Sequence, residues 1–362
     1  YTNNGVINNN TNINVTGNGS AGLFGENGTA ITNSGNINIS NNGVGIYAVS
    51  YQDPQNPETT FGDGTISIVN NGSITTETSS KAIGIYANNN KTGALRSSGT
   101  LNLANGLVDV SLSESGTGIY SENNTVIGGG TISVGENGTG IYAKNSDLNL
   151  SNLTLNLKGD NSLGIYLDSG SNLNMSGTNT ANISGKNNIL FYLDSDGIFN
   201  QNFVINAASD TTYSLAYLKN NKIAYDGTVV TNGDGALFYG TNSSITINPT
   251  ASLTSTGNNT VGVYVDGLYD NGNFDYEGIN KGIINLKDNS AGLYAINGAR
   301  LSNENAISVG DMSIGMYNEN GSDVKNSGNI TIALEDLVTS RPAILMHLTA
   351  IAEQFNKLKQ VH

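Results

Sequence analysis

Aspartate and glutamate are the residues of this 362-residue chain whose spacing could support catalysis. Asp168 and Asp194 each stand two positions after an aromatic residue, Tyr166 and Tyr192, in successive copies of a short repeat. If equivalent positions of successive copies lie one above the other, the two carboxylates come about 5 Å apart, as in retaining glycosidases. One hypothesis is therefore a glycosidase or polysaccharide lyase that uses Asp168 and Asp194.

The same position of neighbouring copies carries both signs of charge, which favours a different interpretation. Glu122 and Lys144 precede the two aspartates, and Lys219 follows them. Mixed charges in one column form a surface ladder that joins neighbouring copies with modest energy. No aromatic platform for a sugar surrounds the acids in the sequence. We therefore expect no catalytic residues and no enzyme activity.

Residues 266–277 hold a dense group of acids and amides that could bind Ca²⁺ through oxygen ligands. The spacing matches neither the twelve-residue calcium loop nor the Gly-Gly-x-Gly-x-Asp coil repeat. A solvated acidic loop is the favoured interpretation, and we expect no metal site.

Five aromatic residues outside the repeat stand in two of the three longer segments, beside acids and amides, and the other longer segment carries Arg96. This mixture is typical of sugar and protein recognition, because rings stack while amides hydrogen-bond. The alternative is that the rings fold back and hold their segments against the protein. The candidate binding residues are Tyr51, Phe61, Arg96, Asp266, Tyr269, Asp270, Asn273, Phe274, Asp275 and Tyr276.

Composition excludes several other kinds of site. The chain has no cysteine, so disulfides, thiolate metal sites and thiol nucleophiles are excluded. Its two histidines, His347 and His362, both lie in the C-terminal segment. The formal net charge of −14 and the lack of a basic stripe argue against nucleic-acid binding. No glycine-rich phosphate loop is present, and we expect no cofactor.

An aliphatic-aromatic step, usually led by glycine, recurs twelve times, as in Gly140-Ile141-Tyr142-Ala143. The aromatic residues stand at 24, 47, 86, 120, 142, 166, 192, 217, 239, 264, 294 and 317. Eight of the eleven intervals are 22 to 26 residues, and the other three, of 39, 34 and 30, are longer. A stack of equal coils with occasional insertions has this pattern.

Each interval holds short segments of alternating apolar and polar residues, such as 147–151 and 153–157. Other coils carry the sequence pattern Ile-x-Asn-x-Gly-x-Ile, as in 31–37. Asn and Gly suit the left-handed backbone conformation of a sharp corner. The pattern predicts an all-β fold, a right-handed parallel β-helix of about twelve coils. We expect the repeat tyrosines to stack in its core. A leucine-rich repeat has a similar period, but its Leu-x-x-Leu-x-Leu-x-x-Asn consensus is missing from this sequence.

The solenoid is predicted to span residues 1–334, with projecting loops at 51–62, 90–98 and 266–277, where the intervals are longest. Residues 335–362 break the repeat. Ile344, Leu348 and Ile351 begin a helical spacing that continues through Phe355 and Leu358. We expect a short amphipathic helix, which is either a cap on the last coil or a foreign tail.

The alternation of Gly-Ile-Tyr-Ala with Ile-Thr-Asn-Ser-Gly-Asn-Ile-Asn-Ile resembles the passenger repeats of type V secretion autotransporters, especially the large fusobacterial-type adhesins. The resemblance covers about residues 1–334. It implies a protein on the outer surface of a Gram-negative anaerobe. Its partners would be host-cell glycans, protein receptors or the surface of another bacterium. It also implies outer-membrane anchoring through a β-barrel absent from this chain, so that the chain would be a slice of a larger protein.

Together these observations predict a non-enzymatic adhesin passenger, in which a β-helical stalk presents loops for attachment. Two alternatives stay open. One is the carbohydrate-active enzyme described above, and the other is a spacer without its own binding site.

Overall fold

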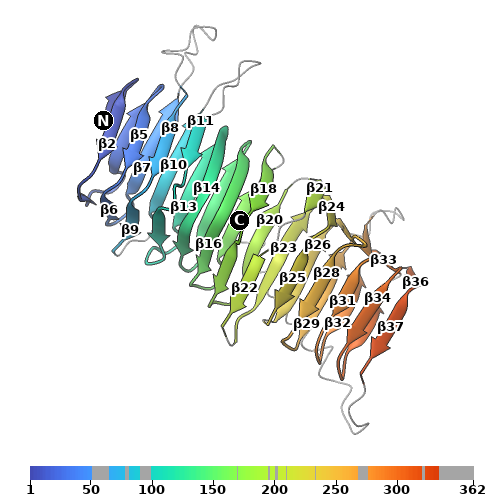
Figure 1. Cartoon of the computed structure of the whole chain (residues 1–362). Coiled ribbons are helices and arrows are strands. Elements are labelled where there is room, and N and C mark those ends of the chain that lie inside the picture. The colour runs from blue at the N-terminus through green and yellow to red at the C-terminus, as the bar shows by residue number, and fades with distance from the viewer. Residues whose placement is uncertain are drawn as a thin grey trace. The chain divides into compact units, whose positions relative to one another are not determined.

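The computed structural model describes residues 1–50, 65–77, 81–89, 99–168, 170–194, 196–199, 203–208, 210–232, 234–267, 276–319 and 323–333. Within these residues all regular secondary structure is β-strand. The chain divides into two compact units, Tyr1–Asn182 and Ile183–His362. In each unit parallel strands stack coil upon coil (Figure 1). The β-solenoid has about twelve turns, which confirms the predicted fold class. The helix expected within 335–362 lies outside the described residues.

Each coil of unit 1 has three strand positions, of which the first carries the aliphatic-aromatic step. The first strands are β1 (Thr2–Asn3), β4 (Ala21–Glu26), β7 (Val44–Ser50), β10 (Ile83–Asn89), β13 (Thr117–Glu122), β15 (Thr139–Lys144) and β17 (Leu163–Leu167). The second are β2 (Val6–Asn9), β5 (Ala30–Asn33), β8 (Ser67–Asn70), β11 (Gly99–Asn102) and β18 (Asn172–Ser176). The third are β3 (Ile13–Val15), β6 (Asn36–Ile39), β9 (Ser73–Thr76), β12 (Leu107–Val110) and β19 (Thr180–Ile183). The longer strands β14 (Asn124–Val134) and β16 (Asp147–Leu157) fill both the second and third positions.

Unit 2 repeats this order. Its first strands are β20 (Asn188–Leu193), β23 (Tyr213–Lys219), β26 (Gly235–Thr241), β29 (Thr260–Asp266), β32 (Ala291–Ile296) and β35 (Ile314–Asn318). Its second strands are β21 (Gly197–Phe199), β24 (Lys222–Tyr225), β27 (Ser244–Ile247), β30 (Glu277–Asn280), β33 (Arg300–Asn303) and β36 (Val324–Asn326). Its third strands are β22 (Phe203–Ala207), β25 (Thr228–Thr231), β28 (Ser252–Ser255), β31 (Ile283–Asn285), β34 (Ala306–Val309) and β37 (Asn329–Ile332).

The register places each repeat residue on its equivalent in the next coil. Ile85 of β10 pairs with Ile46 of β7 on one side and with Ile119 of β13 on the other. All three isoleucines are 0% exposed, so they form one continuous column of the core. Burying each such side chain contributes roughly 1.5–3 kcal/mol, which makes these columns the main source of stability.

Glycine leads the repeat step because the first and third strands of a coil approach each other closely there. A Cβ added to Gly118 of β13 would lie 2.8 Å from Cγ2 of Ile132 in β14 and 2.6 Å from the carbonyl oxygen of Gly140 in the next coil. Ile132 is itself 2% exposed and has little room to move. The position therefore has space for hydrogen only.

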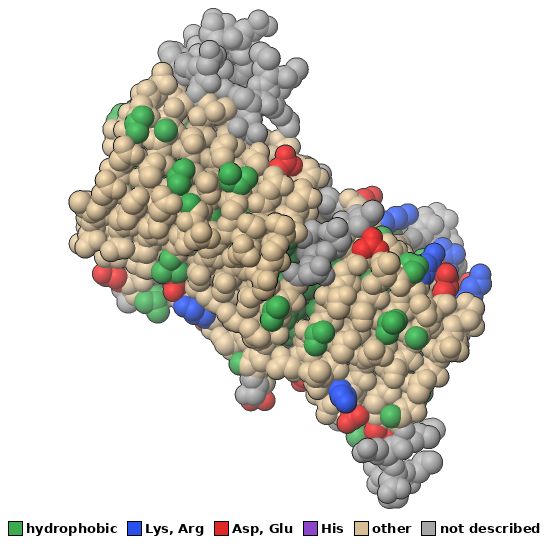
Figure 2. Space-filling model, viewed as in Figure 1, with side chains coloured by type: hydrophobic (Ala, Val, Ile, Leu, Met, Phe, Trp, Pro, Cys, Tyr) green, Lys and Arg blue, Asp and Glu red, His purple; other side chains and the backbone are tan. Residues whose placement is uncertain are grey.

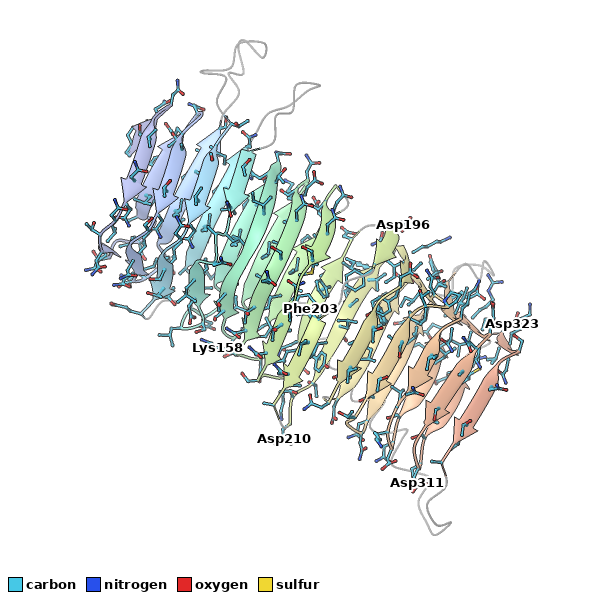
Figure 3. The ribbon with its side chains drawn as sticks, in the orientation of Figure 1. Lys158, Asp196, Phe203, Asp210, Asp311 and Asp323 are labelled. Carbon is cyan, nitrogen blue, oxygen red and sulfur yellow. The ribbon has the colours of Figure 1, made fainter. Side chains whose placement is uncertain are left out.

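Three coils of unit 2 carry a buried leucine in place of this glycine, at Leu190, Leu215 and Leu237. Aromatic rings fill the interior of these coils. The ring centroid of Phe191 lies 4.9 Å from that of Phe199 and 5.4 Å from that of Phe203 (labelled in Figure 3), and Tyr225 lies 4.8 Å from Phe238. Leucine in place of the leading glycine thus marks the coils in which the core changes from aliphatic to aromatic.

Asparagine occupies many corners with positive φ, as the sequence predicts, for example Asn145 at 47° and Asn161 at 55°. The asparagine of the Ile-x-Asn-x-Gly sequence pattern has a different role. Asn33 shares the inward face of β5 with Ile31, and its buried Nδ2 donates to Oδ1 of Asn70 at 2.8 Å, while its Oδ1 accepts from Asn9 at 2.8 Å. A second asparagine ladder joins Asn280 to Asn303 and Asn303 to Asn326. The sequence analysis did not predict these ladders. The signal was the alternation of inward and outward residues along the strand, which places Asn33 on the same face as Ile31.

Substituting Gly118→Ala should lower the free energy of unfolding by about 1–3 kcal/mol, because the methyl group overpacks the contact with Ile132. Urea denaturation of the purified chain measures the change. The matched control is Thr117→Ala, a change at the adjacent, half-buried position that leaves this contact untouched. Equal stability of the two variants would contradict the close-approach explanation.

Candidate functional site

The three longest intervals of the repeat all have their extra residues between the first and second strands of a coil. They fall between β7 and β8, between β10 and β11, and between β29 and β30. The first two are rooted side by side, because Asn89 at the end of β10 pairs in register with Ser50 at the end of β7. On the far side of the two insertions, Thr100 pairs with Ser67. Neighbouring parallel strands lie about 4.8 Å apart, so the described residues that flank the two insertions lie on adjacent coils of unit 1.

Eight of the ten predicted binding residues lie outside the described residues: Tyr51, Phe61, Arg96, Tyr269, Asp270, Asn273, Phe274 and Asp275. The other two flank the third insertion: Asp266 is the last residue of β29, and Tyr276 directly precedes β30.

Asp266 and Tyr276 both link neighbouring coils of unit 2. The Asp266 carboxylate accepts a hydrogen bond from Nδ2 of Asn297 at 2.7 Å, and its carbonyl oxygen accepts one from the amide of Asn242 at 2.8 Å. The carbonyl oxygen of Tyr276 accepts a hydrogen bond from the amide of Arg300 at 2.9 Å. These contacts fix the base of the insertion.

The two aspartates of the enzyme hypothesis fall in different units, Asp168 in unit 1 and Asp194 in unit 2. Oδ1 of Asp168 accepts hydrogen bonds from the amide of Asn145 at 2.8 Å, the amide of Gly170 at 3.1 Å and Oγ of Ser171 at 2.9 Å. Three donors on one oxygen make Asp168 the acceptor that closes its corner. Asp194 accepts one long hydrogen bond, from Nδ2 of Asn221 at 3.4 Å.

One step of the predicted charge column, from Glu122 to Lys144, is present in unit 1. Glu122 pairs in register with Lys144, and Nζ of Lys144 lies 2.9 Å from Oε1 of Glu122. The hydrogen bond to Glu122 raises the pKa of Lys144. Because the lysine is exposed, this pair contributes little to stability.

Two further ion pairs among the described residues join Lys158 to Asp109 at 2.9 Å and Lys281 to Glu304 at 3.8 Å. On the face shown in Figure 2 most of the described surface is polar and uncharged, in keeping with a charged fraction of 12%. In unit 2 the labelled residues Asp196, Asp210, Asp311 and Asp323 lie at strand ends and do not converge (Figure 3). Among the described residues no group of three or more His, Cys, Asp or Glu could hold a metal ion. No helix within that part of the chain is long and apolar enough to cross a membrane.

Five tyrosines of unit 1 stack face to face and form what we term the tyrosine ladder: Tyr47, Tyr86, Tyr120, Tyr142 and Tyr166. Successive ring centroids lie 4.9, 4.7, 5.3 and 4.5 Å apart, and the ring planes deviate from parallel by 6°, 4°, 7° and 7°. This confirms that equivalent rings stack. The expectation that these rings lie in the core is wrong for unit 1, because each tyrosine alternates with inward residues and is half-buried on the outer face.

The ladder is a poor platform for sugars, because each ring face is covered by the next ring and only the ring edges and hydroxyls reach solvent. The Tyr120 hydroxyl donates to Oε2 of Glu122 at 2.8 Å, and the Tyr86 hydroxyl accepts a long hydrogen bond from Nδ2 of Asn88 at 3.5 Å. Burial and the hydrogen bond to Glu122 raise the pKa of Tyr120, so the phenol stays protonated at neutral pH.

Unit 2 has an equivalent stack in which four rings are buried, with 1–6% exposure: Tyr217, Tyr239, Tyr264 and Tyr294. Their successive centroids are 5.3, 4.8 and 5.0 Å apart. Burial, with the neighbouring Tyr317 and Glu319, raises the pKa of Tyr294 to about 12. The two stacks therefore differ in access to solvent.

No protein-family model matches the sequence, and no curated protein matches it.

The corner role of Asp168 predicts that Asp168→Ala lowers the free energy of unfolding by about 1–3 kcal/mol, because three donors lose their acceptor. Asp194→Ala, which removes one long hydrogen bond, is the matched control and should cost less. Chemical denaturation of both variants measures the difference. A cost for Asp194→Ala equal to or above that of Asp168→Ala would refute the assignment.

Proposed function

We propose that this chain is part of a cell-surface adhesin of the autotransporter passenger type. Its coils act as a stalk, and the segments inserted between first and second strands make the contacts. The partners we propose are host-cell glycans or protein receptors, or the surface of another bacterium. The repeat resemblance supports the extracellular location, and the β-solenoid is consistent with a stalk.

The observation that carries this proposal is the shared origin of the insertions. All three fall between the first and second strands of a coil, and two of them follow the register pair Ser50 and Asn89 on adjacent coils of unit 1. Insertion at a corner leaves the strand pairing intact, so these segments can differ in sequence without disturbing the coils. Two segments rooted about 4.8 Å apart can contribute to one contact surface. Several weak contacts of this kind gain strength through multivalency.

The described contacts of the coil wall support the same division of roles. Asp168 closes a corner, Glu122 pairs with Lys144, and Asp266 joins two neighbouring coils. These polar groups already have partners within the protein, so binding through them would first require breaking internal contacts.

The proposal predicts that replacing residues 51–64 with Asn-Gly weakens attachment to host cells or a glycan array several-fold and leaves the unfolding midpoint unchanged. The matched control keeps the length and composition of 51–64 but scrambles the order. If recognition depends on particular residues such as Tyr51 and Phe61, the scrambled variant also loses binding. The same pair of variants applies to 90–98 and 268–275.

Three other outcomes would overturn the proposal. Attachment that survives removal of all three segments would place binding on the coils, and a lack of attachment by the unaltered chain would support the spacer. Release of reducing ends from host glycans, abolished by Asp194→Asn, would instead support the glycosidase or lyase.

A further inference from the structure

The tyrosine ladder of unit 1 has a chemistry that attachment through the insertions does not use. Its five phenols are half-exposed, and each ring lies 4.5–5.3 Å from the next, centroid to centroid. Phenols are the most readily oxidised groups in a chain that has neither cysteine nor tryptophan and only four methionines. Stacking along one face places each phenol beside another phenol.

Tyr120, the middle ring, also has a proton acceptor in place. Its hydroxyl donates to Oε2 of Glu122 at 2.8 Å, and Oε1 of the same carboxylate is held by Lys144 at 2.9 Å. A phenol that loses an electron becomes a strong acid. A carboxylate already bonded to the hydroxyl can accept the proton as the electron leaves. This arrangement favours oxidation at Tyr120 over oxidation at a phenol without such a base.

We propose that the tyrosine ladder is a site of oxidative modification, at which a one-electron oxidant joins neighbouring tyrosines as dityrosine. Two phenols each lose one electron to the oxidant and one proton, and the Tyr120 proton passes to Glu122. The two phenoxyl radicals form a carbon–carbon bond between ring positions ortho to the oxygens. Each ring then becomes aromatic again as the ortho hydrogen moves to its oxygen. The chain loses two hydrogens for each cross-link.

The geometry assigns the coupling partners. Tyr120 lies 4.7 Å from Tyr86 and 5.3 Å from Tyr142, and both neighbours are nearly parallel to it. A bond in either direction ties one coil covalently to the next. The equivalent rings of unit 2 from Tyr217 to Tyr294 are 1–6% exposed, so a dissolved oxidant reaches them less readily.

The experiment treats the intact chain, at low concentration, with light-activated ruthenium tris-bipyridine and persulfate, a small one-electron oxidant. The monomer fraction is then isolated, its dityrosine fluorescence is measured, and its cross-linked peptides are mapped by mass spectrometry. We expect Tyr86–Tyr120 and Tyr120–Tyr142 to be the main pairs, each with the loss of two hydrogens. The proposal is overturned if the monomer has no dityrosine or if its cross-links lie outside the ladder.

Three variants separate the parts of the proposal. Tyr120→Phe keeps the stacked ring and should remove both main cross-links. Glu122→Gln keeps a hydrogen-bond acceptor but takes up a proton poorly, so dityrosine should form several-fold more slowly. Lys144→Gln is the matched control, because it removes the ion pair and leaves the Tyr120–Glu122 hydrogen bond. Circular dichroism verifies that each variant is folded. A Glu122→Gln rate equal to that of the unaltered chain would overturn the proton-transfer step.

Discussion

In-register stacking of parallel strands is the constraint on which the rest of this structure depends. Each residue lies about 4.8 Å above its equivalent, so every column must be built from side chains that tolerate close copies of themselves. Isoleucine does so through apolar contact, as at 46, 85 and 119. Asparagine does so because its amide donates upward and accepts from below, as in Asn9, Asn33 and Asn70. Like charges repel at this distance, so Glu122 is followed by Lys144, and charged residues are only 12% of the sequence.

The same constraint decides where the chain can vary. An extra residue within a strand would shift that strand out of register and turn its core side chains outward. An extra residue at a corner changes neither the pairing nor the columns. The long intervals accordingly keep Tyr47, Tyr86 and Tyr120 in register although they are 39 and 34 residues apart. The three long insertions fall between strands, and a register shift between β14 and β16 lies at a bulge between the second and third strand positions.

The period of the repeat was enough to predict the all-β solenoid, because the Gly-Ile-Tyr spacing reports coil length directly. It was not enough to assign the faces of each strand. Tyrosine was expected in the core because it is large and recurs, yet alternation with inward Ile46 and Ala48 places Tyr47 outside. Asn33 was assigned to a corner by its residue type, although it shares the face of Ile31. The role of Asp168 depends on amides contributed by an adjacent coil and its own corner, which spacing alone does not reveal.

The columns that stabilise the wall also limit what the wall can bind. A sugar needs an open ring face, and a ladder of parallel tyrosines leaves only the ring edges free. A ligand also needs polar groups without internal partners, whereas Asp168, Glu122 and Asp266 are engaged within the coils. The stacked wall does offer a row of neighbouring phenols, and the hydroxyl of one of them, Tyr120, donates to the carboxylate of Glu122. These limits are the reason that we propose recognition at the corners and cross-linking chemistry on the wall.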